Sequence, residues 1–389
     1  MNFYEGYLFF LYLLIALFPA VLLGIFEKPI RCYTLFLSCI FIYLVFHNHP
    51  KQFLYLVLFY ILEFVIIQTY LHLRQKYERK KNIYYGALIL SILPLILSKC
   101  TPFWDLNIFG FLGISYLTFK SIQMIIEIYD GIILNIPLME WLGFFLFFPS
   151  LSSGPIDRSR RFHEDWIKTL TRKDYLSNLG DGLWKLLLGL VYKIVFASYF
   201  HEMMGCYSKS ILWYDIISYA YVYGFYLFFD FAGYSLMAIG TSYILGIRTP
   251  DNFRRPFLAV DIKDFWDRWH ITLSHWFRDF IFTRFVMTCV HKKWFHTRLQ
   301  RASAGFLVNM LIMGLWHGLH LSYLLYGLYH GGLLAITEIY QKKSKFYKKH
   351  KTSPIYRVLS WFVTMQLVMF GFLIFSGRFI EILTLIGGN

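Results

Sequence analysis

Charged residues are scarce in this 389-residue chain. Only 16% of its residues are Asp, Glu, Lys or Arg, whereas 57% are hydrophobic, and a soluble domain carries about 25% charged residues. Apolar runs about long enough to cross a bilayer recur from residues 5–26 to the C-terminal region. The sequence therefore predicts an all-α, polytopic transmembrane protein of roughly 10–12 spans, with additional re-entrant or interfacial helices. The candidate spans lie near residues 5–26, 30–47, 52–73, 83–98, 108–128, 136–151, 182–200, 211–229, 230–246, 302–320, 322–340 and 355–376.

Several motifs of secreted proteins and soluble enzymes are absent from the sequence. No basic segment precedes the first apolar run and no small-residue cleavage site follows it, so we expect this run to remain as a span. The five cysteines are scattered and form no CxxC pair, which argues against a disulfide framework or a thiolate metal site. No HExxH, P-loop or GxSxG motif is present. We therefore expect no bound metal, and serine-type and phosphate-hydrolysis chemistry are unsupported.

The formal net charge of +15 comes from basic residues that cluster between the apolar runs. These clusters are residues 74–81, 158–162, 291–301 and 341–351. Because cytoplasmic loops carry an excess of Lys and Arg, the pattern predicts topology rather than nucleic-acid binding, with both termini outside. Docking of an acidic partner by one of these loops remains open as an additional role.

One segment, DIKDFWDRWHITLSHWFRDF (261–280), is rich in both charged and aromatic residues. Its aromatic side chains follow helical spacing, which predicts one amphipathic helix with His270 on or beside the aromatic stripe. Asp264 and Arg268 are four residues apart and are expected to pair. Such a helix lies on the membrane surface or enters the protein as a re-entrant element. A purely interfacial role for the histidine remains an alternative.

Three histidines lie in the apolar stretch LVNMLIMGLWHGLHLSYLLYGLYHGG (307–332): His317, His320 and His330. Asn309, His317 and His320 are spaced to share one helical face. An ionisable group inside a membrane helix is a candidate functional group, and a buried neutral imidazole can act as a general base. The neighbouring glycines would let another backbone or a slender substrate approach. A hydrogen-bonding role between helices, haem ligation and zinc ligation remain alternatives.

Five ordered stretches of the chain resemble the membrane-bound O-acyltransferase (MBOAT) family. In that family one histidine lies in a polar segment rich in Trp and Arg, and another lies in an apolar helix ahead of a glycine. The stretches are GISYLTFKSI (113–122), FFPSLSSGPIDR (147–158), FDFAGYSLMAIG (229–240), FWDRWHITLSHWFRDF (265–280) and MGLWHG (313–318).

Within this family, length and motif wording most resemble the teichoic acid D-alanyltransferases of Gram-positive bacteria. The alginate O-acetyltransferases are related, but they tend to be longer and carry a polar acidic residue where this chain has Leu236. The resemblance implies one integral-membrane domain over residues 1–389, with the family core at about 100–340, in the cell membrane of a Gram-positive bacterium.

The resemblance also implies the reaction and its participants. The donor would be a D-alanyl thioester on the 4′-phosphopantetheine arm of an acidic carrier protein on the cytoplasmic side. No cofactor would be bound by the chain itself. The acceptor would be a hydroxyl of teichoic acid or of a relay protein, and the other proteins of the D-alanylation pathway would be partners.

The family's catalytic histidine corresponds to His317 in this sequence, and its partner histidine corresponds to His270. We expect the residues around them to line the substrate tunnel or to orient the reacting groups. These residues are Trp266, Arg268, Trp269, Ser274, Asn309, Trp316 and Gly318.

A basic loop after the charged aromatic segment is a candidate docking site for the carrier protein. Val286, Met287 and Val290 would supply an apolar patch beside Lys292 and Lys293, and opposite charges steer protein association. An ordinary positive-inside loop is the alternative interpretation.

Three other functions remain open at this point. The first is an O-acetyltransferase of an exported polysaccharide, which differs in its acyl donor. The second is a transporter or flippase that moves an acyl group or polymer without forming a bond and therefore tolerates loss of both histidines. The third is a haem-binding electron-transfer protein, which would absorb visible light.

Overall fold

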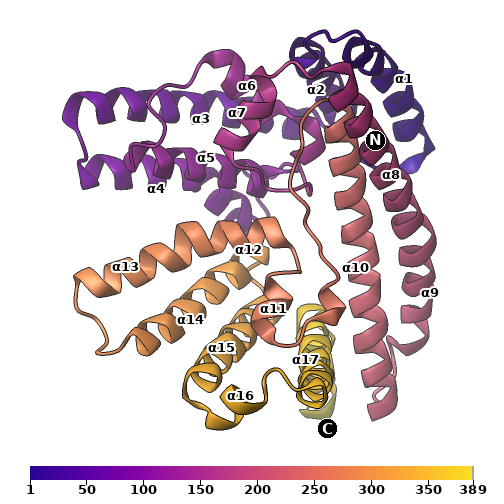
Figure 1. The fold of residues 1–389 in the computed structure, drawn as a ribbon, viewed down its shortest axis with the longest axis vertical. Helices are drawn as coiled ribbons and strands as arrows, with labels where there is room; N and C mark the ends of the chain where they lie inside the picture. The colour runs from indigo at the N-terminus through magenta and orange to yellow at the C-terminus, as the bar shows by residue number, and fades with distance from the viewer. Residues whose placement is uncertain (388–389) are drawn as a thin grey trace. The chain divides into compact units, whose positions relative to one another are not determined.

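The chain folds into α-helices, as predicted. The computed structural model describes residues 1–387 and contains no strand within them (Figure 1). The chain divides into two units. The first contains residues 1–190 and 234–250, and the second contains residues 191–233 and those from 251 onward.

The first unit contains eight helices and the C-terminal part of a ninth, α10, which continues from the second unit. They are α1 (Gly6–Ile25), α2 (Arg31–Phe46), α3 (Pro50–Tyr77), α4 (Lys81–Cys100), α5 (Ile114–Tyr129), α6 (Leu138–Leu146), α7 (Ser159–Ile167), α8 (Arg172–Leu190) and α10 (Trp213–Ile244).

The second unit begins with a π-helical turn, Val191–Ala197, and includes the N-terminal part of α10. Its other helices are α9 (Ser198–Tyr207), α11 (Ile262–Trp266), α12 (Ile271–Phe277), α13 (Thr283–His291), α14 (Arg298–His317), α15 (Leu321–Lys343), α16 (Lys345–His350), α17 (Pro354–Phe375) and α18 (Arg378–Gly387). A second π-helical turn, Arg278–Phe282, joins α12 to α13.

Six helical segments are long and apolar enough to cross a membrane, since about 20 apolar residues span the hydrocarbon core. Helix α2 is apolar but shorter, and α14 and α15 are long but carry more polar residues. The multi-pass membrane character predicted from the sequence is thereby confirmed. The six segments are residues 6–25, 50–77, 81–104, 172–207, 213–244 and 354–375.

Two predicted span boundaries are wrong. The predicted pair 211–229 and 230–246 is the single helix α10. Asp230 does not end a span there, because its carboxylate Oδ1 lies 2.6 Å from Lys193 Nζ and a paired charge is tolerated inside a membrane helix. The predicted span 136–151 is only the nine-residue helix α6, followed by a 3₁₀ turn that contains Pro149. Proline lacks an N–H and clashes with the preceding turn, so α6 does not extend through it.

The short helix α7 lies in the polar region between α6 and α8. Its Arg161 pairs with the carboxylates of Asp157 and Asp165. Asp165 in turn accepts a hydrogen bond from the backbone N–H of Arg248 at 2.8 Å. This network ties α7 to the chain beyond α10 within the first unit.

In the second unit, α13, α14 and α15 follow one another side by side (Figure 1). The α14–α15 contact depends on two glycines. A Cβ atom on Gly314 would lie 2.3 Å from the carbonyl oxygen of Tyr323, and one on Gly327 would lie 2.5 Å from that of Met310. The space beside Gly314 is therefore filled by α15, rather than left open for a substrate.

Candidate functional site

The predicted amphipathic helix 261–280 is broken next to His270. Helix α11 ends at Trp266 and α12 begins at Ile271, so the prediction of one continuous helix is wrong. His270 has φ 44° and ψ 52°, a left-handed conformation that costs a non-glycine residue about 1–3 kcal/mol. Contacts with neighbouring residues must therefore stabilise this backbone conformation, in which the chain changes direction at His270.

Asn252 provides those contacts. Its side-chain oxygen lies 3.2 Å from Nδ1 of His270 and accepts hydrogen bonds from Oγ1 of Thr272 at 2.7 Å and the backbone N–H of Thr272 at 3.3 Å. Because a backbone N–H can only donate, it fixes the amide with its oxygen facing these groups. Nδ1 of His270 therefore carries the proton, and Nε2 is left as the acceptor.

His270 is 5% exposed, and its ring meets Phe231 edge-on with the centroids 4.6 Å apart. Burial lowers the pKa of His270 well below its ordinary value, and the nearby charge of His317 lowers it further. His270 is therefore a neutral imidazole at physiological pH, and it lies close enough to His317 for the charge of that residue to affect it.

His317 is the last residue of α14, and aromatic rings surround it. Its ring centroid lies 4.6 Å from Trp316, 5.0 Å from Phe375 and 6.0 Å from Tyr323. His320 does not share its helical face, contrary to prediction, because α14 ends at His317. His320 instead caps the start of α15.

Three of the predicted tunnel residues line one pocket of about 300 Å³: Trp266, Ser274 and Asn309. Met313 also lines it, and Asn309, Met313 and His317 follow one face of α14 at steps of four residues. At 1.5 Å per residue, His317 lies about 12 Å along the helix axis from Asn309. Neither His317 nor His270 lines the pocket, whose last lining residue on α14, Met313, lies one turn before His317.

This pocket contains two buried polar atoms with no hydrogen-bond partner among the described residues, Nε1 of Trp266 and Oδ1 of Asn309. One is a donor and the other an acceptor. Both atoms are covered by the protein, so a ligand with an N–H and a carbonyl group would pair with them only after a small rotation of these side chains.

The other predicted tunnel residues lie around the pocket rather than in it. Arg268 Nε lies 2.6 Å from Asp264 Oδ1, so the predicted ion pair is present. Trp269 is buried among aromatic rings, including Phe372 at 5.0 Å. Gly318 faces the ring of Tyr323, where a Cβ atom would lie 2.8 Å away. These residues shape the walls of the site.

Two residues of the site were not predicted in the roles that the structure gives them. Asn252 is 18 positions before His270, and no local pattern connects them. His330 is 1% exposed, with its ring centroid 5.4 Å from Trp266 and 4.6 Å from Tyr326. Neither of its ring nitrogens has a hydrogen-bond partner among the described residues. The sequence marks it only as a histidine in an apolar helix.

The sequence profile of the membrane-bound O-acyltransferase family matches residues 42–376. The chain belongs to this family. It is 41% identical to the teichoic acid D-alanyltransferase of Bacillus subtilis, over 96% of this chain and 98% of that protein. The enzyme of the same name from Streptococcus thermophilus is 37% identical, over 96% of this chain and 94% of that protein. A probable alginate O-acetylase of Pseudomonas syringae is 31% identical, but the match covers 69% of this chain and 49% of that protein.

The predicted family resemblance is thus confirmed, and the chain is a multi-pass membrane acyltransferase. Membership of an acyltransferase family favours bond formation over the transporter and electron-transfer alternatives.

In this acyltransferase, the predicted carrier-docking residues lie on α13 and the turn after it. Met287 and Val290 are 54% and 53% exposed, whereas Val286 is half-buried and faces Gly305 of α14. Lys292 and Lys293 are exposed. The apolar patch available to a partner is therefore Met287 and Val290.

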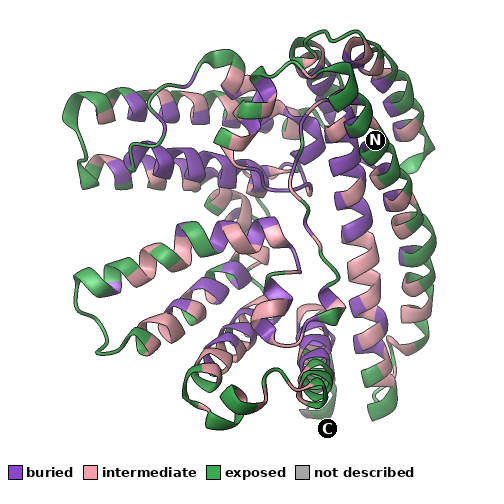
Figure 2. Ribbon diagram, in the orientation of Figure 1, coloured by how far each residue is buried: buried purple, intermediate pink, exposed green. Residues whose placement is uncertain are grey.

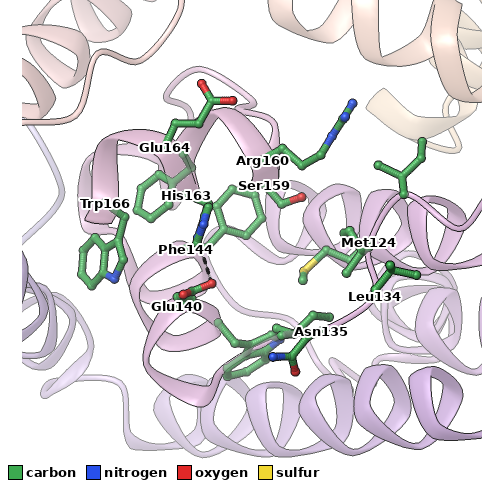
Figure 3. Close-up of a pocket in the computed structure, with 15 residues that line it drawn as sticks. Met124, Leu134, Asn135, Glu140, Phe144, Ser159, Arg160, His163, Glu164 and Trp166 are labelled. Atoms are coloured by element: carbon green, nitrogen blue, oxygen red, sulfur yellow. Dashed lines mark ion pairs between the residues drawn. The ribbon is translucent and has the colours of Figure 1, made fainter. Parts of the chain in front are cut away.

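The first unit of the acyltransferase contains a separate pocket of about 320 Å³ between α6, α7 and the chain before α6 (Figure 3). Nδ1 of His163 and Oε2 of Glu140 form an ion pair of 2.9 Å there. None of the predicted site residues lines this pocket, so it is distinct from the pocket that Trp266, Ser274 and Asn309 line.

Proposed function

We propose that this acyltransferase moves a D-alanyl group from a carrier-protein thioester toward teichoic acid at the cell membrane of a Gram-positive bacterium. The main support is the similarity, over 96% of the chain, to relatives named teichoic acid D-alanyltransferase. The similarity to the alginate O-acetylases is weaker and covers a smaller part of the chain.

The chemistry is an ester formation from a thioester. A hydroxyl oxygen of the acceptor attacks the thioester carbonyl carbon, the C–S bond breaks, and the hydroxyl proton moves to a base while the sulfur leaves as a thiol. His317 is the proposed general base, a role typically worth about 10²–10⁴-fold in rate. His317 is half-buried, and the rings of Trp316, Tyr323 and Phe375 around it support the proposal, because they limit the access of water that would hydrolyse the thioester.

The tautomer of His270 limits the role that this residue can have. Its Nδ1 proton points to Asn252, so its Nε2 accepts hydrogen bonds and cannot donate one to a developing oxyanion. A neutral His270 therefore acts by orienting His317 or the acceptor hydroxyl, or by receiving a proton. It is not the oxyanion donor.

The pantetheine arm of the carrier would occupy the pocket that Trp266, Ser274 and Asn309 line. The arm contains two amide groups, each with an N–H and a carbonyl oxygen, and these match the unpartnered Oδ1 of Asn309 and Nε1–H of Trp266. The acidic carrier would dock on Met287 and Val290, next to the exposed lysines of the same loop.

The test uses the full chain in liposomes, with a carrier protein loaded with radiolabelled D-alanine, teichoic acid and the other pathway proteins. We expect His317→Ala to lose at least 100-fold in label transfer and His270→Ala to lose less or the same. His49→Ala is the matched control, since His49 is exposed and caps no helix with its side chain. Normal transfer by His317→Ala, with an unchanged thermal melt of the intact chain, would refute the proposed base.

The polysaccharide O-acetyltransferase remains the second candidate because of the match to the alginate O-acetylases. The donor separates the two functions. Offering a D-alanyl carrier and an acetyl donor in parallel to the same liposomes should give transfer from the first only. Transfer from the acetyl donor alone would favour the second candidate.

A further inference from the structure

A groove of about 700 Å³ lies in the second unit between α15, α16 and α17. It begins about three turns further along α15 than Tyr323 and Tyr326, which contact His317. Its walls include Ile336, Leu359 and Val363, which are 64%, 60% and 54% exposed. Helix α16 has no buried residue (Figure 2). The floor of the groove is therefore an apolar surface that the chain itself leaves uncovered.

Positive charge gathers at the α16 end of this groove. Lys351 and Arg357 line it and are exposed, and neither forms an ion pair with a described residue. The one carboxylate in the lining, Asp261, already accepts hydrogen bonds from Nε2 of Gln341 at 3.0 Å and from backbone N–H groups at the start of α11. The groove thus offers two cations that are not neutralised from within.

Tyrosine side chains lie among the charged residues at this end of the groove. Tyr340, Tyr347 and Tyr356 all line the groove, and their rings pack with centroids 5.6 Å and 6.1 Å apart. Tyrosine is enriched where the membrane meets water, at the level of the lipid headgroups. Along α17 the lining residues Ile355, Tyr356 and Arg357 come first and the apolar Leu359 and Val363 follow, so charged and aromatic side chains share one end of the groove.

We propose that this groove binds one anionic phospholipid, with its phosphate at Lys351 and Arg357 and its acyl chains on Ile336, Leu359 and Val363. The occupant must carry both a negative head and an apolar tail, because a free phosphate would leave the floor exposed and a neutral lipid would leave the cations unpaired. Lys342, Lys343, Lys345, Lys348 and Lys349, at the end of α15 and in α16, add to the attraction, and basic clusters at the ends of membrane helices favour anionic lipids. The inference does not depend on the identity of the acyl group that the enzyme transfers.

The test measures lipid binding to the purified full chain in a neutral detergent, by native mass spectrometry and by the melting temperature during titration. The probes are phosphatidylglycerol and phosphatidylcholine with identical acyl chains, and glycerol 3-phosphate without them. We expect phosphatidylglycerol alone to bind as a single tight copy and to raise the melting temperature. Equal binding of phosphatidylcholine, or equal stabilisation by glycerol 3-phosphate, would overturn the proposal.

Two matched pairs of variants place the lipid in the groove. Lys351→Ala/Arg357→Ala should weaken phosphatidylglycerol binding about 30-fold, at about 5-fold for each basic residue removed. Lys348→Ala/Lys349→Ala removes the same charge from α16 outside the groove lining and should weaken binding clearly less than the groove pair does. Equal loss in both double variants would mean a diffuse basic surface and no site.

The second pair tests the apolar floor. Leu359→Trp places a large ring in the groove, whereas Val358→Trp places it on an equally exposed neighbour that does not line it. Only Leu359→Trp should weaken the binding of phosphatidylglycerol. Because both side chains are exposed, neither change should alter the melting temperature without lipid, and unchanged binding by Leu359→Trp would overturn the placement of the acyl chains.

Discussion

Replacing Asn252 tests how the strained turn at His270 is maintained. Three donors converge on its side-chain oxygen: Nδ1 of His270, Oγ1 of Thr272 and the backbone N–H of Thr272. One carbonyl oxygen has two lone pairs, so Asn252→Ala leaves about two buried donors unsatisfied. At about 1–3 kcal/mol each, the loss in stability is about 3 kcal/mol.

This loss should lower the melting temperature of the purified chain by an amount on the order of 5 °C. Transfer activity should fall by more than the loss of folded protein explains. Without Asn252, neither the backbone conformation nor the tautomer of His270 is fixed. If Asn252→Ala leaves the melt and the transfer rate unchanged, the hydrogen bonds do not hold His270 and the assignment of its tautomer is wrong.

Asn252→Asp is the matched variant, because it keeps an acceptor oxygen at the same place and adds a negative charge. A carboxylate next to the imidazole stabilises the protonated form, so the pKa of His270 should rise relative to the intact chain. The proposed mechanism needs a neutral His270. As the pH is lowered, the variant should therefore lose activity at a higher pH than the intact chain does. A pH–rate profile measures this, and an acidic limb that stays in place or moves to lower pH contradicts a neutral His270.

Two further predictions concern helices around the site. Met287→Glu/Val290→Glu should weaken carrier binding at least 10-fold in a direct binding assay. Thr288→Glu, which adds a charge to another face of α13, should not weaken it. Equal carrier binding by the intact chain and both variants would exclude α13 as the docking site. Gly314→Ala should lower stability by about 2–4 kcal/mol in denaturation measurements, since its Cβ would lie 2.3 Å from a carbonyl oxygen of α15. Gly332→Ala, with no atom within 4 Å of the added Cβ, should be neutral or slightly stabilising, and the reverse order would contradict the packing of α14 on α15.

Long apolar helices could be predicted from the sequence because their signal is local. The predicted spans 5–26 and 355–376 correspond to α1 and α17 within one residue at each end. The fusion of two predicted spans into α10 could not be predicted in the same way. It depends on the pairing of Asp230 with Lys193, which lies 37 positions earlier in the chain.

The candidate site shows the same division. His270 and His317 stand in motifs that can be read directly from the residues around them. The break at His270 could not be predicted, because the residue that stabilises it is Asn252, outside the motif. Helical periodicity also predicts that His320 shares a helix face with His317. The two are separated because α14 ends at His317. Non-local hydrogen bonds and helix ends therefore limit prediction here more than composition does.

The buried polar atoms of the second unit connect its architecture to acyl transfer. Nε1 of Trp266, Oδ1 of Asn309 and both ring nitrogens of His330 have no partner among the described residues, and each such group costs about 1–3 kcal/mol. Nδ2 of Asn252 and Oγ of Ser303 are also without a partner among the described residues but lie outside the pocket lining. Trp266, Asn309 and His330 form one cluster, because Trp266 lines the pocket with Asn309 and contacts His330. A fold that served packing alone would be more stable with apolar side chains at these positions. Their convergence beside the face of α14 that ends at His317 fits a cavity whose polar groups are satisfied by a substrate.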